Sequence, residues 1–222
     1  GDSCIMTKQN LEEYAYESVV KLIQANHFKP GDFLLETELA EMFNLKSRTP
    51  IRHALGQLVA RGFLEKKKKK GCYVPLVSAE DARHVFFARE TIESSAACSA
   101  AMHATREDVE ELRAVVERES ETGESGRKYD YSTLNEAFHT TIARISRNPY
   151  LQRYCEHIFW RSNIYVFLFG GYYTQPNFVK HMLSPPQHIR IVDAIENRDA
   201  EKARELMAQH VRFTFDRIFN LI

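Results

Sequence analysis

The feature that most constrains the fold is the helical periodicity of the last two thirds of the chain. From Ser78 onward, apolar residues recur at three- and four-residue spacing, with almost no alternation of apolar and polar residues. Such spacing places the apolar side chains on one face of a helix, whereas alternation is typical of a strand. The sequence therefore predicts an all-helical domain over residues 76–222.

Breaks in this periodicity divide the domain into helices. The residues at the breaks cap, end or interrupt helices, and they are Ser78, Thr105, 122–126, Asn148-Pro149, Gly170-Gly171, Pro176, Pro185-Pro186 and Asp199. We therefore expect helices that begin after Ser78, Thr105, 128, 149, 185 and 199. The last two are expected to cover about 186–196 and 200–220, with Asp199 as the N-cap of the final helix.

The first 75 residues combine short helices with short extended segments. Apolar spacing predicts helices over about 11–25, 38–43 and 50–59. Ser47 or Thr49 can cap the third of them, and Asn44 suits the left-handed turn before it. Residues 33–35 are expected to be extended, and the segments on either side of Lys66–Lys70 predict a β-hairpin with a basic tip.

Positive charge is concentrated in this part of the chain, although the whole chain carries 30 Lys plus Arg and 30 Asp plus Glu. Residues 46–75 contain nine Lys or Arg and a single acidic residue, Glu65. A compact cationic segment joined to a near-neutral body is typical of a module that binds a polyanion. A lysine run that only keeps a loop solvated is the alternative.

Helix, helix, tight turn, helix and basic hairpin together predict a winged helix-turn-helix over residues 7–75, a motif that lays its second helix in the DNA major groove. The segment resembles the GntR family of bacterial transcription regulators. The resemblance lies in Pro30-Gly31, Glu38-Leu39-Ala40, Ser47-Arg48-Thr49-Pro50-Ile51-Arg52, Ala54-Leu55, Leu58, Gly62 and Gly71. The fold class expected for the whole chain is therefore mainly α, with one small β-hairpin wing.

Arg48 and Arg52 stand four residues apart, which places both guanidinium groups on one face of a helix near its N-terminus. By resemblance, the residues expected to contact DNA are Ser47, Arg48, Thr49 and Arg52 on the helix and Lys70 and Gly71 in the wing. The alternative is that the two arginines only solvate a helix face.

Histidines in the C-terminal domain predict a metal site. His188 and His210 lie equally far on either side of the turn at residue 199, so an antiparallel helix pair brings them to the same height. Asn135 and His139 stand four apart on one face of another helix. Three imidazoles inside a helical bundle suit Zn, Ni, Cu or Fe, but core or surface histidines without a metal are the alternative.

The C-terminal domain resembles the ligand-binding domain of the FadR subfamily in Arg89-Glu90-x-x-Glu93, Asn135-x-x-Phe138-His139, His188-x-x-Ile191 and Met207-x-x-His210. The resemblance implies a divalent metal, Zn or Ni, held by His139, His188 and His210. Asn135 stands at the position where the family has an Asp. It also implies a small organic-acid effector, for which the expected contacts are Arg89, Arg161 and Asn163.

These features together predict a ligand-responsive DNA-binding regulator, a repressor rather than an enzyme, that acts as a homodimer on palindromic double-stranded operator DNA. A metal-dependent enzyme that uses the histidines is one competing hypothesis, but no general base is evident beside them. An acyl-CoA-type sensor without metal is another, and such a sensor has no need of three histidines.

The chain contains no stretch of about 18 consecutive apolar residues and no basic segment followed by an apolar run at its start. Its four cysteines, at positions 4, 72, 98 and 155, form no CxxC pair. We expect a cytoplasmic chain with reduced thiols and no membrane contact.

Overall fold

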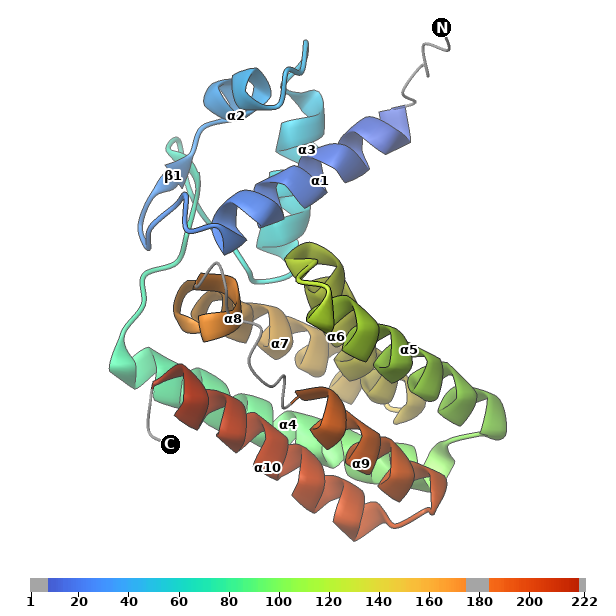
Figure 1. Cartoon of the computed structure of the whole chain (residues 1–222). Helices are drawn as coiled ribbons and strands as arrows, with labels where there is room; N and C mark the ends of the chain where they lie inside the picture. Colours follow the sequence, from blue (N-terminus) through green and yellow to red (C-terminus); the bar gives the residue numbers. More distant parts are fainter. Residues whose placement is uncertain (1–7, 175–183, 220–222) are drawn as a thin grey trace, which may run out of the picture. The chain divides into compact units, whose positions relative to one another are not determined.

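The computed structural model describes residues 8–174 and 184–219, which fall into two compact units divided between Val77 and Ser78. The first unit contains three helices and a small sheet, and the described part of the second unit contains helices alone (Figure 1). This architecture confirms the predicted fold class, and each unit is described below by itself.

Three helices form the body of the first unit: α1 (Lys8–Gln24), α2 (Glu36–Met42) and α3 (Thr49–Ala60). Helix α3 packs against both of the others, and the core between them includes fully buried Ile23, Ile51 and Leu58. The backbone of Asn44 takes a left-handed φ of 53° after α2, as predicted. This residue turns the chain from α2 toward α3.

Three short strands form one antiparallel sheet in the order β1-β3-β2. They are β1 (Phe33–Leu34), β2 (Glu65–Lys67) and β3 (Gly71–Tyr73). Strands β2 and β3 form the predicted hairpin, and the lysines between them make its tip. The sequence predicted an extended segment at β1 but not its pairing, in which Phe33 lies opposite Tyr73. Pairing with β1 supports a hairpin that is only marginally stable alone.

All three helices of the first unit begin differently from the prediction. Helix α1 begins at Lys8, three residues before the predicted start. Helix α2 begins at Glu36, two residues early, with Leu35 at its N-cap, because Glu36 and Glu38 are both favourable in a first helical turn. The predicted capping of α3 by Ser47 or Thr49 is wrong, since Arg48 occupies the N-cap and its side chain makes no capping bond. Instead, the Ser47 hydroxyl accepts a hydrogen bond from the Thr49 N–H (3.2 Å).

The second unit contains seven described helices. They are α4 (Ala79–His103), α5 (Arg106–Glu124), α6 (Lys128–Ile145), α7 (Pro149–Phe169), α8 (Gly171–Thr174), α9 (Ser184–Glu196) and α10 (Ala200–Ile218). The predicted caps Ser78, Thr105 and Asp199 accept hydrogen bonds from amides of the following turn. Asn148, which was predicted only as a break between helices, does the same at the start of α7. Side-chain capping therefore sets the start of four of these helices, three of them as the sequence predicted.

The prolines before the penultimate helix do not interrupt it as predicted. Helix α9 begins at Ser184, so Pro185 and Pro186 lie in its first turn. A proline is tolerated there because the first amides of a helix have no acceptor within the helix. The predicted break at Pro176 lies outside the described residues, and the one-turn helix α8 was not predicted.

Helix α4 is the packing centre of the second unit. It contacts α6, α7, α9 and α10, and Figure 1 shows it alongside α10. Many of its buried positions are small, among them Ala96, Ala97 and Ala100, so neighbouring helices can approach it closely. In the part of the chain that the structure describes, no helix has the length and apolar character needed to cross a bilayer.

Asp108 closes a capping box at the start of α5. The Thr105 N–H donates to its carboxylate (2.9 Å), the Asp108 N–H donates to the Thr105 hydroxyl (3.2 Å), and Arg147 lies 2.6 Å from the same carboxylate. Burial alone raises the pKa of Asp108, but the bonds from Thr105 and the charges of Arg147 and Arg144 hold that pKa below its ordinary value. Its stabilising effect is therefore complete above about pH 4 and is lost as the pH falls through the lower folded-state pKa.

We expect Asp108→Asn to reduce the free energy of unfolding by about 1 to 2 kcal/mol at neutral pH, because the charge-assisted bond to Arg147 is lost. The difference between the variant and the wild type should shrink in acid, where Asp108 becomes protonated. Urea unfolding at about pH 7 and about pH 3 measures both effects. Glu107→Gln, which changes an exposed carboxylate in the same turn, is the matched control. Equal stability of Asp108→Asn and Glu107→Gln at neutral pH contradicts the prediction.

Candidate functional site

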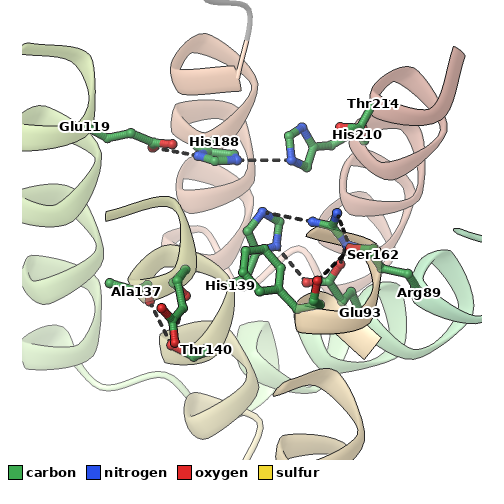
Figure 2. Close-up of polar contacts among 12 residues, drawn as sticks. Arg89, Glu93, Glu119, Ala137, His139, Thr140, Ser162, His188, His210 and Thr214 are labelled. Atoms are coloured by element: carbon green, nitrogen blue, oxygen red, sulfur yellow. Dashed lines mark hydrogen bonds and ion pairs between the residues drawn. The ribbon is translucent and has the colours of Figure 1, made fainter. Parts of the chain in front are cut away.

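Three histidines from three helices meet inside the second unit. His139 comes from α6, His188 from α9 and His210 from α10, and all three are buried. Their potential ligand atoms lie within 4.8 Å of one another. The Nε2 atoms of His188 and His210 are 3.1 Å apart, so these two rings face each other across the helix pair as predicted. Figure 2 shows the three rings turned toward one centre.

The Nδ1 atom of each ring is held by an oxygen acceptor on its outer side. Nδ1 of His139 lies 2.7 Å from Glu93, Nδ1 of His188 lies 2.7 Å from Glu119, and Nδ1 of His210 lies 2.6 Å from Gln187. Glu93 and Glu119 are 2 % and 0 % exposed. A ring nitrogen that is hydrogen-bonded to an oxygen acceptor carries the proton, so Glu119 and Gln187 hold it on Nδ1 of His188 and His210. At His139 the carboxylate of Glu93 acts on Nδ1 as an ion-pair partner.

This tautomer leaves the Nε2 lone pairs facing inward. Two of them stand 3.1 Å apart with no proton to share, an arrangement that a cation at the centre relieves. Carboxylates that hold the outer nitrogen of a metal-binding histidine are the usual supporting shell of such sites. The donor set therefore fits a divalent transition metal that prefers imidazole nitrogen.

Burial keeps two of the three histidines, His139 and His210, neutral. It lowers the pKa of His139 to about 4, against the opposing pull of Glu93, and it lowers the pKa of His210 well below its ordinary value, helped by the nearby His188. Burial alone raises the pKa of Glu93, but Arg89 and His139 outweigh it and bring the pKa to about 2. At neutral pH the site thus offers the unprotonated imidazoles of His139 and His210 beside the ionised carboxylate of Glu93.

Arg89 of α4 joins the histidine cluster to a cavity. Its guanidinium donates to Glu93 (2.5 Å) and to the Ser162 hydroxyl (3.2 Å), and it lies 3.4 Å from Nε2 of His139. Arg89 also lines a cavity of about 80 Å³ whose wall includes His210 and Asn135. A carboxylate in this cavity therefore has an arginine and a histidine beside it.

The other two predicted effector contacts lie elsewhere. Arg161 pairs with Asp81 in the first turn of α4 (2.8 Å), and Asn163 is buried, but neither residue lines this cavity. Ser162, between them in the sequence, accepts a hydrogen bond from Arg89. One residue corresponds to about 100° of rotation around a helix, so neighbours in the sequence face different partners.

Sequence reasoning did not assign the residues that hold the outer ring nitrogens. Glu93 had a detectable signal, because it stands four residues after Arg89 on one helix, the spacing of an ion pair. Glu119 comes from α5 and meets α9 only in the folded bundle. No local spacing in the sequence indicates that contact.

The residues expected to contact DNA lie on the surface of the first unit. Ser47, Arg48, Thr49, Arg52 and Lys70 are exposed. Arg52 forms an ion pair with Glu36 of α2 (3.0 Å), which fixes its guanidinium across the two helices. Gly71, at the end of the basic tip, has a φ of 102°, a conformation that side-chain-bearing residues rarely adopt.

Comparison with known proteins assigns both units. Residues 11–74 match the family model "Bacterial regulatory proteins, gntR family", and residues 84–213 match the FCD domain. The Nta operon transcriptional regulator of Aminobacter aminovorans is 28% identical over 88% of this chain and 89% of its own length. The HTH-type transcriptional repressor RspR of Escherichia coli is 25% identical over 82% of this chain and 78% of its own length.

A solved structure has the same fold. "E. coli McbR/YncC" superposes with a TM-score of 0.73 at 21% identity, covering 95% of this chain and 98% of that chain. The curated relatives named above are transcription regulators and not enzymes, which agrees with the expected function class. The chain thus belongs to the gntR family of bacterial regulatory proteins, as a DNA-binding transcription regulator with a C-terminal FCD domain.

Proposed function

We propose that this regulator is a repressor whose FCD domain binds a divalent cation, Zn or Ni, together with a small organic acid. The observation that carries the proposal is the convergence of three buried imidazoles whose ligand atoms lie within 4.8 Å of one another. The cation supplies a positive centre, next to the cavity, to which a carboxylate can bind. His139, His188 and His210 hold that cation, and Asn135 in the cavity wall is the candidate for a fourth, neutral ligand.

Charge balance supports a cation at the cluster. Glu93 and Glu119 are both buried, and Arg89 is the one cationic side chain that the structure places in contact with the cluster among the described residues. The cluster therefore holds two buried carboxyl groups and one guanidinium. Buried charge is costly unless it is compensated, so a divalent cation at the three Nε2 atoms is electrostatically favoured.

The size of the cavity supports a small effector. A volume of about 80 Å³ holds only a few molecules the size of water, too little for a long acyl chain. Arg89, at 2 % exposure, offers a charge-assisted bond to the carboxylate of such an acid. This favours the small acid over the acyl-CoA-type ligand.

DNA binding by the winged helix-turn-helix is proposed to use Arg48 and Arg52 at the start of α3, with Ser47 and Thr49 beside them and Lys70 and Gly71 in the wing. One such unit reads a half-site, so a homodimer on a palindromic operator doubles the contacts. The effector then acts by binding more tightly to the bundle arrangement that disfavours DNA binding. The relative RspR of Escherichia coli is a transcriptional repressor, which supports the direction of the effect.

Metal content tests the cation site. We expect about one Zn or Ni ion per chain in the purified wild-type protein by elemental mass spectrometry, and almost none in the double variant His139→Ala/His188→Ala. His84→Ala, which removes an exposed histidine of α4, should retain the metal. Circular dichroism shows whether the double variant folds. The metal content of the more conservative variant His188→Gln is measured as well. Full metal content in a folded double variant excludes the site.

Glu119 provides a second test, which leaves every proposed metal ligand in place. Because Glu119 holds the proton on His188 Nδ1, Glu119→Gln should weaken metal affinity by about 10- to 100-fold. Competition with a chromogenic chelator measures the affinity. Glu117→Gln, an exposed change on the same helix, serves as the control. If both variants bind metal as the wild type does, Glu119 has no supporting role in the site.

The proposed DNA contacts of α3 are tested with a DNA duplex that the wild-type chain selects from a random pool. Arg48→Ala and Arg52→Ala should each weaken binding at least about tenfold, while the folding stability and metal content stay unchanged. Fluorescence anisotropy at several salt concentrations measures the loss. Lys21→Ala removes one exposed positive charge from α1 and should have a much smaller effect. Wild-type affinity in both arginine variants would disprove the assignment.

A further inference from the structure

The three histidines of the cluster differ in what holds their outer ring nitrogens. Two of them have a carboxylate there, which Figure 2 shows beside each ring, whereas Nδ1 of His210 lies 2.6 Å from the amide oxygen of Gln187. A neutral amide is a weaker acceptor than a carboxylate, so it orients the ring less firmly and makes it a weaker metal ligand. His210 is therefore the most weakly held ring of the cluster.

Aromatic packing fixes the other two rings as well. The ring of His188 is stacked on Phe138, with 3.8 Å between the ring centroids, and the ring of His139 lies 5.0 Å from that of Phe159. A ring in a close-packed interior turns only if its neighbours move. His139 and His188 thus form the rigid part of the cluster.

His210 borders a second cavity, of about 160 Å³, between α9 and α10. Gln187 lines this cavity too, and the exposed residues Arg190 and Gln209 form part of its wall. The cavity therefore leads from the surface of the bundle to the buried ring of His210. The other two histidines are not among the described residues of its wall. The ring with the weakest outer partner thus also has free space beside it.

We propose that the metal ion enters and leaves the cluster past His210, through the cavity between α9 and α10, and that Gln187 sets the rate of this exchange. The inference rests on the proposed cation site and adds to it a route and a positioning residue, which acts through the ring of His210. Solvent screens the positive charge of Arg190, because this side chain is exposed.

The order of events follows from the difference between the rings. When His210 turns into the cavity, the cation stays bound to the two histidines that carboxylates and aromatic rings hold in place. Water and the amide oxygens of Gln187 and Gln209, which line the cavity, can then replace the lost imidazole, because oxygen ligands also bind divalent cations. Loading follows the same steps in reverse.

Zinc release from the zinc-loaded full chain tests the role of Gln187. The chain is mixed with an excess of a chromogenic chelator in a stopped-flow instrument, and the release rate is recorded. We expect Gln187→Ala to release zinc about tenfold faster than the wild type, and Gln187→Glu, which supplies a carboxylate of the same shape, to release it about tenfold more slowly. Gln152→Ala removes a glutamine of α7 that bonds to Glu156, and it should keep the wild-type rate.

A second variant tests the route. Gln209→Trp places a large ring in the wall of the cavity without changing a proposed ligand or its outer partner. Zinc loading and zinc release should both slow by about fivefold or more, while the Kd, which is the ratio of the two rates, changes by less than about twofold. A residue with a merely structural role changes the Kd instead.

Thermal unfolding establishes that each variant is folded. Wild-type release rates in both Gln187 variants, changes of the same direction in both, or wild-type rates in Gln209→Trp overturn the inference while the cation site stands. If the wild-type chain retains no zinc after incubation with zinc and removal of the free metal, the cation site fails together with the inference.

Discussion

The second unit depends on the compensation of charged groups within its interior. Arg89, Glu93 and Glu119 are at most 2 % exposed, and an isolated buried charge is strongly destabilising. Each is held by a partner on another helix: Arg89 by Ser162, Glu93 by His139 and Glu119 by His188. These contacts tie α4, α5, α6, α7 and α9 together at one level of the bundle. Apolar packing alone permits sliding between helices, whereas this network specifies their register.

The same network makes the bundle sensitive to what binds at its centre. A ligand that contacts His210 and Arg89 touches α10 and α4 at once, and these two helices pack along each other. Helix α4 begins immediately after Ser78, so the sequence connects the first element of the effector unit directly to the end of the DNA-binding unit. On the proposed function, a ligand that binds one arrangement of the bundle more tightly than another acts on the helix that follows this connection.

The sequence predicted those features that local rules determine. Ser78, Thr105 and Asp199 mark their helix starts because capping depends on a few neighbouring residues. The pairing of His188 with His210 was also predictable, since a tight turn between two helices fixes their relative height. Contacts that link distant segments gave no local signal. The pairing of β1 with β3 and the approach of Glu119 to His188 both depend on tertiary packing, which spacing along the chain does not encode.

Asn135 shows how the buried carboxylates bear on the choice of ligands. The FadR-type pattern has an aspartate at this position, which adds a negative charge to the cavity wall. In this chain, Glu93 and Glu119 already place two carboxylates behind the imidazoles. A third carboxylate, at residue 135, increases the repulsion between negative charges within the metal-free bundle. It also neutralises part of the positive charge of the cation, which is then not available to an acid ligand. On the proposed function, a neutral amide at residue 135 therefore leaves the charge of the cation to the acid ligand.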